Sequence, residues 1–123
     1  MNVLRQAIKK AMSDFECSED SIRASFLFDK DFIGFQGHFE NRSIVPGVCK
    51  IQALLLMLEE KYKKSVTLEE IENVKFFHPV TCSEKLEFFC RDPLFGRKKT
   101  IKCLVSKDDK KIADIQLKIS IGI

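Results

Sequence analysis

The run of apolar residues from Val48 to Leu58 constrains the fold of this chain more than any other feature. Its apolar positions lie on every side of a helix: Val48, Ile51, Leu54, Leu55 and Leu58 form one stripe, and Cys49, Ala53, Leu56 and Met57 occupy the other sides. A helix that is apolar nearly all round is a buried helix. Pro46 suits its first turn, where the missing N–H costs no hydrogen bond. We therefore predict a central helix from about Pro46 to Lys63, with a sheet wrapped around it.

The flanking sequence supplies the other elements of such a fold. Apolar periodicity predicts one further helix, one strand before the central helix and four strands after it: a helix over 2–13, then strands over 21–29, 70–77, 84–91, 99–106 and 111–121. We interpret residues 14–20 as a connection and residues 106–110 as a hairpin turn. This order predicts an α+β fold with an antiparallel sheet around one helix. At 123 residues, 1–123 is expected to be a single domain.

Composition argues against several classes of function. The net charge is only +3 and there is no Trp. We interpret the densest basic patch, Arg97 to Lys99, as a solvated turn. No nucleic-acid partner is therefore expected. Two distant histidines and five cysteines without a Cys-x-x-Cys pair argue against a metal site. The apolar run is too short for a membrane span, and the first residues do not resemble a signal peptide. We expect a cytoplasmic protein with reduced thiols.

The segment Gly34–Phe39 carries His38 in a loop rich in glycine and phenylalanine, just before the predicted central helix. Long ordered loops in small domains tend to carry function. A histidine titrates near neutral pH and can therefore move protons. The backbone N–H groups at a helix start can hold a polarised carbonyl or an oxyanion. The sequence therefore indicates a candidate active site where this loop meets the helix.

These segments resemble the signature of the β-hydroxyacyl-acyl-carrier-protein dehydratases. The resemblance rests on Phe35–Phe39 followed by Ile44–Val48, with the spacing from the histidine to Pro-Gly kept without a gap. Downstream, Phe76–Val80 followed by Leu86 is similar to the family's strand after the helix. The resemblance covers about residues 20–121. It implies a hotdog fold and a role in fatty-acid biosynthesis, hence in lipid metabolism.

The resemblance also implies site roles. His38 would be the general base that takes the α-proton of a 3-hydroxyacyl thioester, and Gly47 would donate its backbone N–H to the thioester carbonyl. The acyl chain would lie in an apolar tunnel at a dimer interface, lined by Phe35, Phe39 and Val48. The substrate would be carried on acyl carrier protein or coenzyme A. The product would be the trans-2-enoyl thioester, and no cofactor would be needed.

The sequence departs from the family's pattern at one expected catalytic position. The family has a carboxylate fourteen residues after its histidine, contributed by the other subunit, and here that position is Gln52. An amide has no titratable proton, so Gln52 can orient a water molecule or hydroxyl group but cannot act as general acid. Glu40 and Ser43 replace the usual prolines after the His-Phe pair. We interpret Cys49 as a small core residue.

Three functions stay open from the sequence. The first is a dehydratase in which His38 performs both proton steps, helped by a water molecule held by Gln52. The second is a non-catalytic or heterodimeric hotdog subunit that binds acyl chains or acyl carrier protein and pairs with a related chain. The third is an acyl thioesterase, in which Gln52 would position the attacking water. His78 is expected to be structural in all three.

Overall fold

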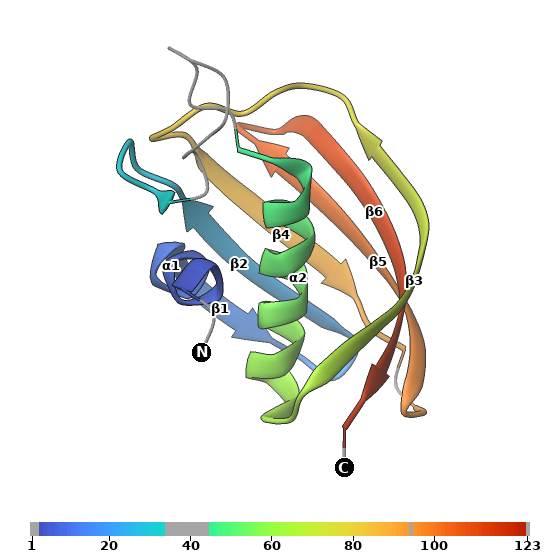
Figure 1. The fold of residues 1–123 in the computed structure, drawn as a ribbon. Helices are drawn as coiled ribbons and strands as arrows, with labels where there is room; N and C mark the ends of the chain where they lie inside the picture. Colours follow the sequence, from blue (N-terminus) through green and yellow to red (C-terminus); the bar gives the residue numbers. More distant parts are fainter. Residues whose placement is uncertain (1–2, 34–44, 94, 123) are drawn as a thin grey trace.

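The computed structural model describes residues 3–33, 45–93 and 95–122. Two helices and six strands follow one another along the chain: α1 (Val3–Ala11), β1 (Met12–Cys17), β2 (Ser21–Leu27), α2 (Gly47–Tyr62), β3 (Val66–Phe76), β4 (Lys85–Arg91), β5 (Lys98–Lys107) and β6 (Lys110–Ile121). The strands form one antiparallel sheet in the order β1-β2-β4-β5-β6-β3. The sheet curves around α2, and α1 lies beside α2 near β1 and β2 (Figure 1). The predicted α+β fold with a central helix is confirmed.

The core forms where α2 meets the inner face of the sheet. Ala53, Leu54 and Leu58 of α2 have no exposed surface. Alternate side chains of β2 and β4 face them, and the rings of Phe26 and Phe88 meet edge to face with centroids 4.9 Å apart. Burying an aliphatic or aromatic side chain of this size contributes about 1.5–3 kcal/mol. The apolar sequence of α2 is therefore explained by contact with the sheet on one side and with α1 on another.

Two strands differ from the sequence-based prediction. Residues 14–20 were expected to be a connection, but most of them belong to β1, which pairs with β2 through an irregular register between Ser13 and Glu16. β1 could not be recognised from apolar alternation, because an edge strand needs few apolar residues and this one is mostly polar. Its pairing is also irregular at Asp14, which has a positive φ of 53°. β3 begins at Val66, four residues before the predicted start at residue 70. The start was missed because acidic residues in this strand interrupt the apolar alternation.

The C-terminal end of α2 is fixed by a buried charge cluster around Asp92. The carboxylate of Asp92 accepts hydrogen bonds from Lys61 Nζ at 2.8 Å, from Lys99 Nζ at 3.0 Å and from the Tyr62 hydroxyl. Burial alone would raise the pKa of Asp92, but these hydrogen bonds outweigh burial and lower it. The expected solvated turn at Arg97–Lys99 is therefore only partly correct, because Lys99 is buried in this cluster.

Candidate functional site

The N-terminus of α2 is anchored beside the connection from β3 to β4. The N–H of Val45 donates to the carbonyl of Val80 at 2.8 Å, which fixes the chain just before the helix. Pro46 is the N-cap residue and makes no side-chain capping hydrogen bond. The first N–H groups of any helix lack partners within the helix, so a start without a side-chain cap can present them to a ligand. The N–H of Cys49 is already used, since it donates to Pro46 O at 3.0 Å.

Gly47, the first residue of α2, lies against the ring of Phe76 at the end of β3. A Cβ atom at Gly47 would lie only 2.7 and 2.8 Å from two carbons of that ring. No side chain therefore fits at this position unless Phe76 moves. The contact gives Gly47 a packing role in addition to the carbonyl-binding role expected from the sequence, and it places an aromatic ring beside the helix start.

Lys50 is a charged residue of this region to which the sequence analysis gave no role. Its side chain is buried, with Nζ 3.4 Å from Val45 O and 5.0 Å from the centroid of the Phe76 ring. Burial lowers the pKa of Lys50, since a desolvated ammonium is less favourable than a hydrated one. The signal in the sequence was a lysine inside a run that is otherwise apolar except for Gln52, which is consistent with either a solvent-facing position or a buried charge.

The predicted site residues fall into two groups. Gly47 lies at the helix start, Val48 beside it is 58% exposed, and Gln52 is half-buried one turn further on. The other predicted site residues, Phe35, His38 and Phe39, lie outside the described residues.

The two residues interpreted as having no catalytic role behave differently from each other. Cys49 is buried, and burial raises the pKa of its thiol although Lys50 opposes the shift, so Cys49 is the core residue expected and not an activated nucleophile. His78 is exposed. A structural role was expected for His78, but its exposure gives no support for that role.

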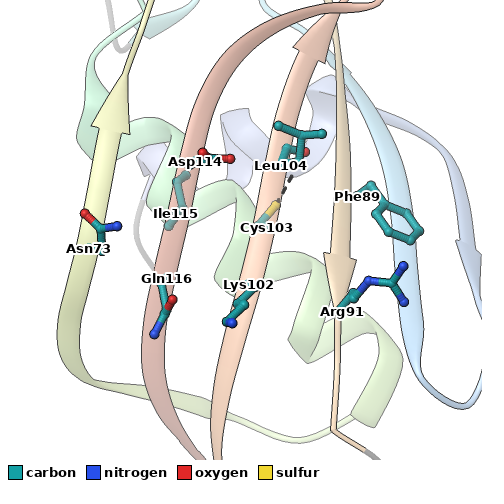
Figure 2. A pocket seen from close by; sticks show the side chains of 9 residues that line it. All are labelled: Asn73, Phe89, Arg91, Lys102, Cys103, Leu104, Asp114, Ile115 and Gln116. Carbon is teal, nitrogen blue, oxygen red and sulfur yellow. Dashed lines mark hydrogen bonds between the residues drawn. The ribbon is translucent and has the colours of Figure 1, made fainter.

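A separate hollow of about 500 Å³ lies on the outer face of the sheet (Figure 2). Its walls come from β3, β4, β5 and β6 and include Phe89, Arg91, Lys102, Leu104, Asp114 and Gln116. These side chains alternate along their strands with the buried residues that face α2, so the hollow and the start of α2 lie on opposite sides of the sheet. The hollow is therefore not the apolar tunnel expected beside the helix.

Two further observations concern the described part of the chain. No three His, Cys, Asp or Glu side chains are grouped there so that they could hold a metal ion. Within the same residues, neither helix has the length and apolar character required to cross a membrane.

Residues 14–115 match the ApeI-like family, described as ApeI dehydratase. Because the match covers most of the sequence, this chain belongs to the ApeI-like dehydratase family. No curated protein matches significantly.

Several solved structures share the fold at low sequence identity. The dehydratase heterocomplex ApeI:P from Xenorhabdus doucetiae superposes with a TM-score of 0.73 at 18% identity, covering 89% of this chain and 96% of that chain. The putative thioesterase yhdA from Lactococcus lactis gives 0.74 at 14% identity, with 98% and 97% covered. The virulence protein Cj0977 from Campylobacter jejuni gives 0.72 at 11% identity, with 97% and 95% covered. The predicted hotdog fold and its dehydratase family are confirmed.

Proposed function

We propose that this protein is a (3R)-hydroxyacyl thioester dehydratase, which removes water from the substrate to give the trans-2-enoyl thioester. The observation that carries the proposal is the start of α2: an anchored helix N-terminus without a side-chain cap, at a glycine held against Phe76. Removal of an α-proton beside a thioester places negative charge on the carbonyl oxygen. Backbone N–H groups at a helix start stabilise such charge.

In the proposed reaction, His38 takes the α-proton as general base and the Gly47 N–H binds the thioester carbonyl. The hydroxyl group then leaves as water, with the proton returned by His38 through a water molecule that Gln52 orients. Phe35, Phe39 and Val48 would line the apolar path of the acyl chain. The exposure of Val48 in the single chain fits a surface that another chain or a ligand covers.

The proposed site needs a second chain. β3 is an eleven-residue edge strand of the sheet, and most of its residues are exposed, including Ile71 and Phe76. Phe77, which follows the strand, is exposed as well. An exposed edge of this length presents unpaired backbone groups that can pair with another strand. The edge supports a homodimer formed through β3. It equally suits a heterodimer with a related hotdog subunit, and a non-catalytic subunit would belong to such an assembly. The similar dehydratase ApeI:P from Xenorhabdus doucetiae is a heterocomplex, which supports this alternative.

The biological setting is part of the same proposal. The substrate would be attached to acyl carrier protein or coenzyme A, and the reaction would belong to fatty-acid biosynthesis in the cytoplasm. Exposed basic residues near the C-terminal end of α2, such as Lys64 and Arg97, would suit an acidic carrier, because opposite charge steers association.

The test is an assay of the purified protein with a (3R)-3-hydroxyacyl thioester, following the absorbance of the enoyl product. We expect product formation by the wild-type protein and its loss in His38→Ala. Absence of enoyl product both alone and with a related hotdog chain, or full activity in His38→Ala, would refute the proposal. Activity that appears only after addition of a related hotdog chain would instead support the heterodimer.

An acyl thioesterase is the second candidate, supported by the fold shared with a putative thioesterase from Lactococcus and by the half-buried amide of Gln52. The two reactions leave different products. Dehydration keeps the thioester and creates a double bond, whereas hydrolysis releases a free thiol. Measuring free thiol in the same reaction therefore separates the two activities.

A further inference from the structure

Lys50 places a cation where helix electrostatics do not favour one. The N-terminus of a helix carries a partial positive charge, so acidic side chains are favoured in the first turn and basic ones in the last. The first turn of α2 has no acidic residue. Lys50 lies one turn from Gly47, and only 3% of it is exposed. The partial positive charge of the helix N-terminus and the ammonium charge of Lys50 therefore add in a region with little solvent.

The direction of the side chain brings its charge back to the helix start. Cα–Cβ bonds of a helix tilt toward the N-terminus, so Lys50 extends toward the residues that precede it. Its Nζ lies 3.4 Å from the carbonyl of Val45 and 5.0 Å from the centroid of the Phe76 ring. The same ring contacts Gly47. The ammonium and the proposed carbonyl-binding glycine thus share one aromatic neighbour.

No anionic side chain in the described residues balances this charge. The ion pairs found there join other lysines and arginines to carboxylates, and none includes Lys50. The contacts of its Nζ are one long hydrogen bond to a carbonyl and the face of a ring. A buried charge is costly unless it is paired, so a buried lysine beside the helix start points to an anion that it meets there.

We propose that Lys50 is a further electrostatic residue of the site, whose ammonium stabilises the oxyanion formed on the thioester carbonyl at the start of α2. This inference rests on the proposed function, because it requires a thioester at Gly47. It applies equally to an enolate in dehydration and to a tetrahedral oxyanion in hydrolysis. No proton has to be transferred by Lys50 in this role, so the chemistry of His38 and Gln52 is unchanged.

The first test compares Lys50→Met with the wild-type protein in the thioester assay. Methionine keeps much of the length and volume but removes the charge, and replacing a buried charge with an apolar group is often neutral for stability. We expect kcat to fall about tenfold to a hundredfold with KM nearly unchanged, somewhat less than for loss of a direct oxyanion donor. Lys50→Arg should keep more of the activity, and Lys110→Met at the exposed start of β6 is the matched control.

The second test needs no turnover and uses acetoacetyl-pantetheine, a 3-oxoacyl thioester that ionises reversibly to an enolate with its own near-ultraviolet absorbance. We expect wild-type protein to raise the enolate fraction of the bound ligand at fixed pH, and Lys50→Met and Lys50→Gln to lower it about tenfold or more. Thermal unfolding of each variant shows that the fold is kept.

The outcomes separate this inference from the function on which it rests. If the wild-type protein turns over or binds the thioester while Lys50→Met and Lys50→Gln keep both kcat and the enolate fraction within twofold, the role of Lys50 is refuted and the proposed function stands. If the protein neither binds nor turns over any acyl thioester, the proposed function and the role of Lys50 fall together.

Discussion

At the scale of single residues, the contact between Gly47 and Phe76 determines the shape of the helix start. We predict that Gly47→Ala destabilises the protein by about 1 kcal/mol, the low end of the cost of overpacking, because the Phe76 ring is half exposed and can shift. Alanine is a better helix former than glycine, so the loss would come from the collision with Phe76 and not from helix propensity. Urea unfolding of the variant and the wild-type protein measures the change in the free energy of unfolding.

The matched control is the same substitution in a Phe76→Leu background, which removes the ring atoms that the new methyl group would meet. In that background Gly47→Ala should cost much less, which gives a coupling energy between the two positions. An equal cost in both backgrounds would show that the ring is not the obstacle.

The residues of the site were only partly predictable from the sequence. The Pro-Gly pair and the apolar run predicted where α2 begins, and the family resemblance pointed to Gly47 and Gln52 as candidate site residues, which stay predictions. Phe76 and Lys50 were missed as site residues because their importance depends on a contact between the end of β3 and the first turn of α2. These two segments are far apart in the chain, so their contact produces no pattern in the sequence around either residue.

At the scale of elements, the C-terminal end of α2 depends on Asp92. We predict that Asp92→Asn lowers the free energy of unfolding by about 3–5 kcal/mol, because Lys61 and Lys99 lose the carboxylate that pairs them in a buried position. Asp108→Asn in the exposed β5–β6 turn should have little effect and provides the control. Chemical denaturation at neutral pH gives both values.

The same carboxylate predicts a pH dependence. The pKa of Asp92 is lowered in the folded protein, so its contribution is complete above the pKa of an unfolded aspartate, about 3.9. The contribution is lost as the pH falls through the folded pKa. The stability difference between wild type and Asp92→Asn should therefore be constant above about pH 5 and shrink in more acidic solution. A difference that stayed constant into acid would contradict this role.

Elements could be predicted where apolar periodicity is strong. α2 and the strands β2, β4, β5 and β6 follow their expected ranges closely, because each presents alternating or continuous apolar positions to one core. β1 was missed because an edge strand that packs few side chains carries a polar sequence.

At the scale of the whole molecule, β3 is the open edge through which we expect a second chain to pair. We predict that Ile71→Glu, which adds a third carboxylate beside Glu70 and Glu72, converts the dimer to a monomer and removes activity. Ile71 is half exposed in the single chain, so the monomer should remain folded. Light scattering gives the molar mass, and circular dichroism reports the fold.

The control for the edge is Leu104→Glu, which places the same charge at an exposed apolar position on the outer face of the sheet. This variant should keep the assembly and the activity. Dissociation caused by Leu104→Glu, with none caused by Ile71→Glu, would place the interface on the outer face instead.

The proposed thioester dehydratase site combines His38 of one chain with Gln52 of another. It is tested most directly by mixing two inactive variants, His38→Ala and Gln52→Leu, after dissociation and reassembly. If the site is shared, random mixing should restore about a quarter of wild-type dehydration, because half of the dimers are mixed and each holds one intact site. If the mixture stays inactive although mixed dimers form, both residues act within one chain and the shared site is refuted.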